Sequence, residues 1–229
     1  MAMNILVTGG MGETAGPIIT LLHEAGHSVT PFDIINGDDI CDFDAIDRAA
    51  RGVDAVIHLA VNVANTSDDA LTFQTNVYGT YNVLHAARGN HVRKVLMAAS
   101  APVHLPPGCA CDAGEDFAYD LTKQLQETMA LHFAATYAMH ILVLRLGHIV
   151  NGRAQTDLAG VPLAELSYCC GGWVCRYDVA RAFSKAIEAD CAGYHRIDII
   201  GSHQAAARFD LDAARALIGF ECGEKFWQY

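Results

Sequence analysis

A short apolar stretch that ends in a glycine-rich turn and leads at once into a helical pattern constrains the fold of this chain most. Residues 4–8 read NILVT, the turn reads GGMGETAG, and apolar side chains then recur at helical spacing. Glycine adopts backbone conformations that other residues adopt only with strain. The stretch therefore predicts a strand, a tight turn and a helix packed closely on the strand.

Short apolar runs alternate with longer helical patterns over the first two thirds of the chain. The expected strands are residues 4–8, 27–32, 54–60, 94–100 and 140–146, and the helices between them are residues 13–25, 42–51, 68–88 and 115–138. Such alternation is typical of parallel βαβ units, and near-continuously apolar strands indicate helices on both faces of the sheet. The sequence predicts an α/β fold with a doubly wound parallel sheet.

The regular pattern weakens after Leu146. Residues 147–172 contain several glycines and no strong period, so we expect an irregular or substrate-facing segment there. A helix over 178–190, a strand over 195–200 and a helix over 211–218 are expected to follow. The predicted organisation is a main domain over residues 1–152, with residues 153–229 forming a small lobe and the closing elements of the sheet.

The charge and hydropathy of the chain limit the classes of molecule that we expect it to bind. The 229 residues include 26 acidic and 15 basic side chains, a net charge of −11, which disfavours nucleic acid and anionic membrane surfaces. A small anionic ligand is compatible with this charge where basic side chains cluster locally. No apolar run approaches the roughly 18 residues of a membrane span, and no secretion signal is recognised, so we expect a cytoplasmic protein without membrane partners.

The eight cysteines and eleven histidines do not form a recognisable metal or redox motif. No C-x-x-C pair and no zinc-type spacing is present in the sequence. We expect free thiols, no metal site and no assigned role for the cysteines.

The glycine turn has the spacing of a phosphate-binding turn. Gly9, Gly12 and Ala15 follow one another at intervals of three. Glycines there let backbone N–H groups approach a pyrophosphate, which the N-terminus of the following helix also favours. Asp33 ends the second expected strand, about 20 residues further on, where a carboxylate accepts the hydroxyls of an adenosine ribose and repels a 2′-phosphate. The pattern favours NAD.

A possible catalytic group follows the fourth expected strand. Tyr119 and Lys123 are four residues apart in a helical segment and therefore project from one face. An ammonium group near a phenol favours the phenolate, so the tyrosine can exchange a proton with a substrate hydroxyl. Ser100, at the end of the fourth strand, adds a hydroxyl at the edge of the sheet where ligands bind.

Seven landmarks, in order, make the chain resemble the extended short-chain dehydrogenase/reductase family. They are TGGMGETA, Asp33, DAVIHLAV, NVYGTYNVLHAAR, AAS, YDLTK and LRLGHIVNG. The likeness covers residues 4–152 and, more loosely, 177–183 and 209–221. It points to the NAD-dependent epimerases and dehydratases and, more weakly, to the uronate dehydrogenases, and it implies a Rossmann-type NAD-binding domain with a small C-terminal substrate lobe.

The resemblance also implies roles for individual residues. Ser100, Tyr119 and Lys123 would form the catalytic set, and Asn76 would fix the active-site helix and strand. The residues that would bind NAD are Gly9, Met11, Gly12, Asp33, Asp39, Ile40, Leu59, Ala60, Tyr119 and Lys123, with Asp39 and Ile40 at the adenine.

The chain departs from the family pattern at several places. Ala15 replaces a frequent third glycine, His104 replaces a frequent tyrosine, and His148 replaces a frequent asparagine near the substrate phosphates. The C-terminal lobe is also small. These departures weaken the expectation of a bulky nucleotide-sugar substrate and leave it open.

The implied function is NAD-dependent redox chemistry at a secondary alcohol of a sugar-like substrate. An epimerase, a dehydratase and a dehydrogenase share these motifs, and the alternative is an NAD-binding regulatory protein with little turnover. Arg145 and Arg176 are candidates for holding a substrate carboxylate or phosphate, and both equally suit an ion pair within the fold. A homodimer that pairs the helices over 68–88 and 115–138 across a two-fold axis is expected.

Overall fold

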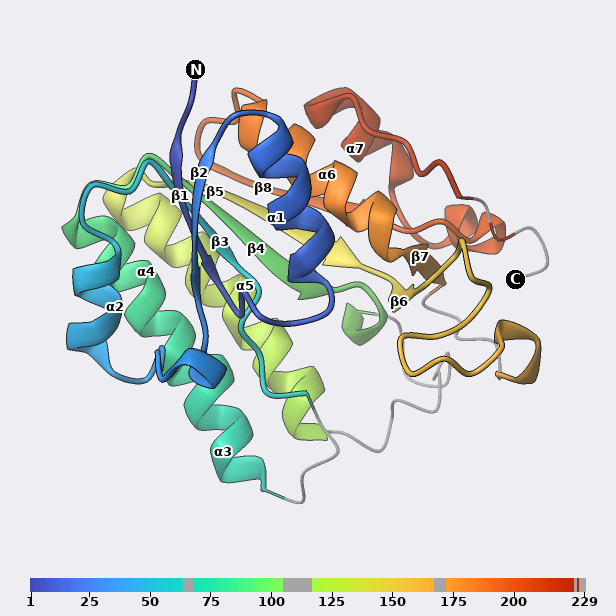
Figure 1. Ribbon diagram of the computed structural model, residues 1–229, viewed down its shortest axis with the longest axis horizontal. Helices are drawn as coiled ribbons and strands as arrows, with labels where there is room; N and C mark the ends of the chain where they lie inside the picture. The colour runs from blue at the N-terminus through green and yellow to red at the C-terminus, as the bar shows by residue number, and fades with distance from the viewer. Residues whose placement is uncertain (64–67, 105–116, 167–171, 225, 227–229) are drawn as a thin grey trace.

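A six-stranded parallel sheet forms the centre of the molecule (Figure 1). The computed structural model describes residues 1–63, 68–104, 117–166, 172–224 and 226. The strands, in spatial order, are β2 (Ser28–Phe32), β1 (Asn4–Thr8), β3 (Ala55–His58), β4 (Lys94–Ser100), β5 (His140–Leu146) and β8 (Tyr194–Ile199). All five expected strands are present, and the expected strand near the C-terminus closes the sheet. The predicted doubly wound α/β fold is confirmed.

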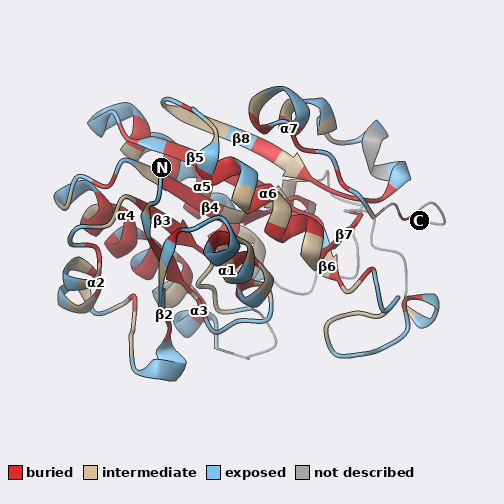
Figure 2. Ribbon diagram, turned by 45° about the horizontal axis from the view of Figure 1, so that its top comes forward, coloured by how far each residue is buried: buried red, intermediate tan, exposed pale blue. Residues whose placement is uncertain are grey.

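Helices cover both faces of the sheet, so the central strands β1, β3, β4 and β5 are buried on both sides, whereas most residues of the edge strand β2 are exposed or half-buried (Figure 2). One layer holds α1 (Ala15–Glu24), α6 (Arg176–Glu188) and α7 (Leu211–Ile218), and the other holds α2 (Phe43–Ala49), α3 (Asp69–Phe73), α4 (Thr80–Gly89) and α5 (Phe117–Tyr137). Two apolar clusters fill the spaces between the sheet and these layers, one around Phe183 of α6 and one around Leu84 of α4. This burial explains the continuously apolar strands.

The strand order reverses at β1, which places a crevice at the carboxyl edge of the sheet. Strand β1 pairs with β2 on one side and with β3 on the other. The connections that leave the carboxyl ends of β1 and β3 therefore run to opposite faces of the sheet, to α1 on one face and to α3 and α4 on the other. In sheets of this kind ligands bind at such a switch point.

The expected single helix over residues 68–88 is interrupted. It is divided into α3, a π-helical turn η2 (Gln74–Gly79) and α4. A π turn adds one residue per turn, which apolar spacing over a long helix does not resolve. Such turns occur frequently at functional sites, and this one carries Asn76.

The expectation of an irregular segment over residues 147–172 is wrong at its beginning. β6 (His148–Val150) pairs in parallel with β7 (Trp173–Cys175) to form a second small sheet. Three residues are too few to show a period, and the partner strand lies more than twenty residues away along the chain. The Trp173 and Phe226 rings pack edge to face, with 5.9 Å between ring centroids and 88° between ring planes, within a small apolar cluster beside this second sheet.

Among the described residues, no helix combines the length and apolar character needed to cross a membrane.

The glycine turn brings the end of β1 against the end of β3. Gly9 has φ +69°, and a Cβ atom on it would lie 2.6 Å from the backbone N of Ala60. Its N–H donates to the carbonyl of Phe32 at 2.9 Å, which joins the turn to the end of β2 as well. Only glycine combines this φ with this close approach.

Replacing Gly9 by alanine tests the requirement for this close approach. We expect Gly9→Ala to destabilise the fold by about 2–4 kcal/mol, because the added methyl both strains φ and collides with the backbone. Gly16→Ala is the matched control in the same turn region, since nothing lies within 4 Å of its added Cβ. The free energy of unfolding of that variant should rise by up to about 1 kcal/mol, because alanine has a higher helix propensity than glycine. Urea unfolding measures both, and equal stabilities would contradict the steric account.

Candidate dinucleotide cleft and catalytic site

A cavity of about 320 Å³ lies at the carboxyl ends of β1, β2 and β3. The sequence-predicted cofactor residues that line it are Gly9, Asp33, Asp39, Ile40 and Ala60. They come from three separate stretches of the chain, and the fold brings them to one place. The cavity is therefore a candidate site for the adenosine half of a dinucleotide.

The Asp33 carboxylate is held rigidly at this cavity. Its Oδ2 accepts the backbone N–H of Met11 at 3.0 Å, and its Oδ1 accepts the N–H of Ile35 at 3.0 Å. Each carboxylate oxygen has a further lone pair for a ribose hydroxyl. Met11 is placed next to Asp33 through its backbone, while its side chain is exposed.

The chemistry of the cavity suits a ribose that carries no 2′-phosphate. Three carboxylates, from Asp33, Asp38 and Asp39, line it, and no basic residue is among its described lining residues. A phosphate would meet repulsion without a cationic partner. The donors, acceptors and glycine cradle therefore fit NAD.

Two more of the residues predicted to bind the cofactor, Leu59 and Gly12, are not among the described residues that line this cavity. Leu59 follows β3 and donates its N–H to the Thr8 carbonyl at 3.0 Å. Gly12 lines a different cleft, on the far side of the turn.

Lys123 connects the predicted catalytic helix to the strand that ends at Ser100. Its Nζ donates to the carbonyl of Ala98 at 3.1 Å and lies 5.9 Å from the centroid of the Tyr119 ring. The side chain is buried, and burial lowers the pKa of its ammonium to about 8, although the carboxylate of Glu127 acts in the opposite direction. The structure thus places Lys123 close to Tyr119, as their spacing predicts, and also joins Lys123 to β4.

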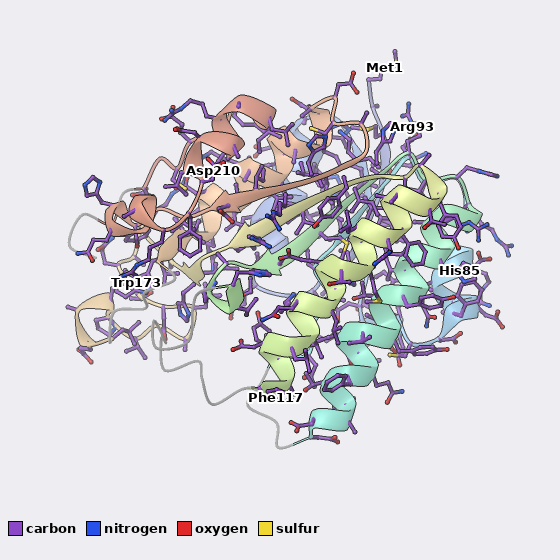
Figure 3. The ribbon with its side chains drawn as sticks, turned by 180° about the vertical axis from the view of Figure 1, so that it is seen from behind. Met1, His85, Arg93, Phe117, Trp173 and Asp210 are labelled. Atoms are coloured by element: carbon purple, nitrogen blue, oxygen red, sulfur yellow. The ribbon has the colours of Figure 1, made fainter. Side chains whose placement is uncertain are left out.

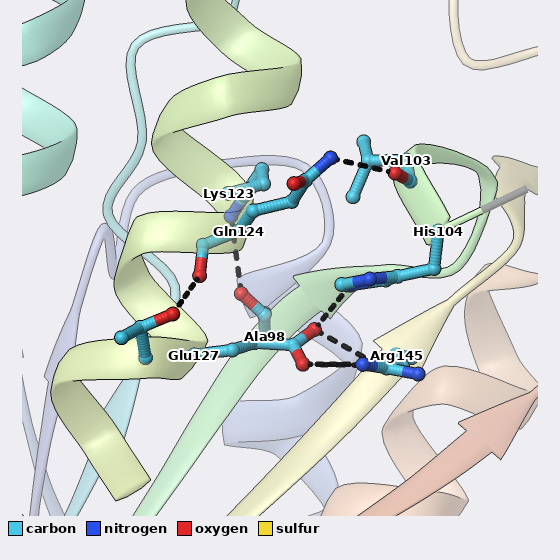
Figure 4. A network of polar contacts seen from close by, with 8 residues as sticks. Ala98, Val103, His104, Lys123, Gln124, Glu127 and Arg145 are labelled. Atoms are coloured by element: carbon cyan, nitrogen blue, oxygen red, sulfur yellow. Dashed lines mark hydrogen bonds and ion pairs between the residues drawn. The ribbon is translucent and has the colours of Figure 1, made fainter. Parts of the chain in front are cut away.

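Glu127 lies one turn beyond Lys123 and is the centre of a polar cluster (Figure 4). The Arg145 guanidinium on β5 donates to both of its carboxylate oxygens, through Nε to Oε1 at 2.9 Å and through Nη2 to Oε2 at 2.7 Å. His104, in the turn after Ser100, pairs with Oε1 at 2.7 Å. Burial raises the pKa of the Glu127 carboxyl, but hydrogen bonds from His104 and Arg145 outweigh it and leave the pKa below its usual value. The cluster joins α5 to both strands that flank it.

The two candidate anion-binding arginines differ in their surroundings. Arg145 is 14% exposed and forms the ion pair with Glu127, so its guanidinium is occupied within the fold. Arg176, at the first position of α6, lines the same cleft as Gly12, and its buried Nε has no hydrogen-bond partner among the described residues. Only Arg176 is placed to meet a ligand.

A second network of buried hydrogen bonds supports α5, the helix that carries Tyr119 and Lys123. Asn76, fully buried in the π turn, donates to the Thr122 hydroxyl at 3.0 Å and to the Asn62 carbonyl at 3.1 Å. The ring of His58 bridges the hydroxyls of Thr8 and Thr80. Burial, helped by the nearby Lys123 cation, lowers the pKa of His58 to about 3, so the ring stays neutral.

Sequence reasoning missed Glu127 and His58. The spacing Y-x-x-x-K-x-x-x-E, from Tyr119 to Glu127, continues one helix face and was a usable signal. No such signal points to His58, because its hydrogen-bond partners lie 22 and 50 residues away along the chain. No cluster of His, Cys, Asp and Glu suited to a metal ion occurs within the ranges that the structure describes.

A model of the NAD dependent epimerase/dehydratase family matches residues 5–160. Among curated proteins, L-arabinose 1-dehydrogenase (NAD(P)(+)) of Haloferax volcanii is 26% identical over 213 residues, which cover 81% of this chain and 82% of that protein. Uronate dehydrogenase of Pseudomonas syringae pv. tomato is 28% identical over 155 residues, which cover 61% of this chain and 56% of that protein.

Solved structures share the whole architecture. A short-chain dehydrogenase/reductase superfamily protein from Agrobacterium tumefaciens, solved with bound NAD, superposes with a TM-score of 0.75 at 21% identity. The match covers 96% of this chain and 92% of that one. At this identity the similarity supports the fold.

The charge on Lys123 should depend on Glu127, and binding of NAD measured against pH tests this. The wild-type affinity should fall as the pH rises through about 8, because Lys123 then loses its proton. Glu127→Gln removes the carboxylate that favours the ammonium, so the fall should begin at lower pH. It also leaves Arg145 without its partner, so we expect a loss of stability of about 3 kcal/mol.

Arg145→Gln is the matched variant for this test. It breaks the same ion pair but keeps the carboxylate, so the pH at which NAD affinity falls should stay or move upward. A purely structural role for the pair would move both variants in the same direction, and that result would contradict the electrostatic account.

Proposed function

Since the chain belongs to the NAD-dependent epimerase/dehydratase family, we propose that it oxidises a secondary alcohol of a sugar-like substrate with NAD. The chain is an NAD-dependent enzyme of the extended short-chain dehydrogenase/reductase type.

The observation that carries the proposal is the position of Lys123. Its ammonium is buried, hydrogen-bonded to the strand that ends at Ser100 and close to the ring of Tyr119. A buried cation beside a phenol favours the phenolate, which is the form that removes a proton. No such burial would be needed for a lysine on a solvated helix face.

In the proposed reaction Tyr119 takes the proton of the substrate hydroxyl. Ser100 holds the substrate oxygen through its hydroxyl, and Lys123 stabilises the phenolate and holds the nicotinamide ribose. Bound NAD supplies the hydride acceptor at its nicotinamide ring. Asn76 supports the set indirectly, because it fixes Thr122 between Tyr119 and Lys123.

A free sugar or sugar acid is the substrate class that we favour. The arabinose dehydrogenase matches this chain over most of both lengths. The matched curated relatives include a uronate dehydrogenase as well. Epimerase chemistry on a nucleotide sugar uses the same set, and the test below includes it.

Replacing Tyr119 by phenylalanine tests the catalytic assignment. Tyr119→Phe removes only the hydroxyl, so turnover should fall about 10²–10⁴-fold while NAD affinity stays nearly unchanged. Formation of reduced nicotinamide with L-arabinose and glucuronate, and interconversion of UDP-glucose, would be followed for wild type and variant. Phe133→Leu, on the same helix but in an aromatic cluster with Tyr81 and Tyr137, is the control for loss of a ring. Wild-type turnover in Tyr119→Phe would overturn the assignment.

A homodimer through α4 and α5 is the proposed assembly. The two helices lie side by side on the face seen in Figure 3, and Phe117 marks the start of α5 there. Half of the large apolar side chains that the described residues leave exposed come from this region: Leu71, Tyr78, Tyr81, Phe117, Leu131 and Tyr137. Pairing across a two-fold axis would bury them. The cytoplasmic location expected from the sequence also stays a prediction.

Light scattering at micromolar concentration tests the dimer. The wild type should give twice the monomer mass, and Leu131→Glu should give a monomer with unchanged helix content, because a charge in the paired surface meets its own copy. Val161→Glu, at another exposed apolar residue outside this region, should leave the dimer intact. A monomeric wild type would count against the proposed assembly.

A further inference from the structure

A cleft of about 750 Å³ lies between α1 and α6 and carries an unbalanced positive charge. Its walls come from the first turns of both helices and from the segment after β6. Three arginines line it, Arg153, Arg176 and Arg181, against one carboxylate, Glu13. The whole chain has a net charge of −11, so this local excess runs opposite to the rest of the molecule.

Two of these arginines have no carboxylate partner among the described residues. Arg181 is paired with Asp178, but neither Arg153 nor Arg176 takes part in a described ion pair. Glu13, although it lines the same cleft, is exposed and makes no ion pair with them in the described part of the chain. The buried Nε of Arg176 also lacks a hydrogen-bond acceptor within the residues described.

Tyr177 holds the two unpaired guanidinium groups near each other. The Cζ of Arg153 lies 3.9 Å from the centroid of the Tyr177 ring, and the Cζ of Arg176 lies 5.2 Å from it. The two cations are therefore at most about 9 Å apart. Cation–π contact orients a guanidinium but leaves its N–H donors and most of its charge available. Two like charges this close create a local positive potential that favours the binding of an anion between or beside them.

The adjacent N-terminus of α1 adds to the same field, whereas α6 carries one acidic residue, Asp178, in its first turn. Neither α1 nor α6 has a side chain that caps its N-terminus, and α1 has no acidic residue in its first turn. The free N–H groups of a first turn attract anions, although they do not by themselves define a site. Here they border a cleft that already contains two unpaired guanidinium groups.

We propose that Arg153 and Arg176 form an oxyanion site that binds a phosphate group of a small ligand. A guanidinium offers paired donors that match phosphate oxygens. Two ligands carry such a phosphate group: the dinucleotide, through its pyrophosphate, and a sugar-like substrate that is phosphorylated. The pyrophosphate is a candidate because Gly12 belongs to the glycine turn and also lines this cleft. The site deepens the proposed function, and it does not depend on the role of Tyr119.

Calorimetric binding to the full chain tests the site. The double variant Arg153→Met, Arg176→Met removes both charges, and Arg48→Met, at an exposed arginine of α2, is the matched control. The probes are inorganic pyrophosphate, NAD with adenosine as its phosphate-free counterpart, and glucose 1-phosphate with glucose as its counterpart. Thermal unfolding of each variant verifies that the fold is kept.

We expect at least one phosphate-bearing probe to bind the double variant 10-fold or more weakly, while the phosphate-free counterpart and the Arg48→Met control stay unchanged. A loss for NAD identifies the cofactor pyrophosphate, and a loss for glucose 1-phosphate with NAD retained identifies a substrate phosphate. Unchanged affinities for all three phosphate-bearing probes would overturn the site. The readout is binding, so that failure is separate from any loss of turnover in Tyr119→Phe.

Discussion

The hydrogen bond from the Met11 N–H to the Asp33 carboxylate is the contact on which the cofactor side of this molecule depends. It ties the glycine turn after β1 to the end of β2, while the close approach of Gly9 to Ala60 ties the same turn to the end of β3. Three strand ends are thereby fixed around one cavity. A charge-assisted hydrogen bond to a carboxylate is stronger than a neutral one, so the acceptor for the ribose is oriented before any ligand arrives.

The catalytic side depends on a second, buried electrostatic arrangement. Lys123 is buried near Tyr119, and burial alone would favour its neutral form. Glu127 opposes this effect, and Arg145 and His104 in turn keep Glu127 ionised and in place. The charge on the proposed catalytic lysine is thus set by residues on α5, β5 and the turn after β4. Residues that stabilise the fold therefore also set the charge at the proposed catalytic site.

Local patterns in the sequence predict the strands, the glycine turn and the Tyr119–Lys123 pair, because each depends on neighbours a few residues away. The π turn that carries Asn76 and the short strand β6 have no such local pattern. Arg145 shows the same limit: its sequence context suits a ligand as well as an ion pair, and only the fold brings it to Glu127, 18 residues away. The Arg153–Tyr177–Arg176 group likewise depends on how the segment after β6 packs against α6.

The central claim is that the carboxyl edge of this sheet is built for a dinucleotide with a free ribose, and comparing NAD with NADP by calorimetry tests it most directly. With Asp33 at the cavity and no basic side chain among the described lining residues, NAD should bind at least 10-fold more tightly, and Asp33→Ala should weaken NAD more than NADP. Equal or tighter binding of NADP to the unaltered protein would contradict the account.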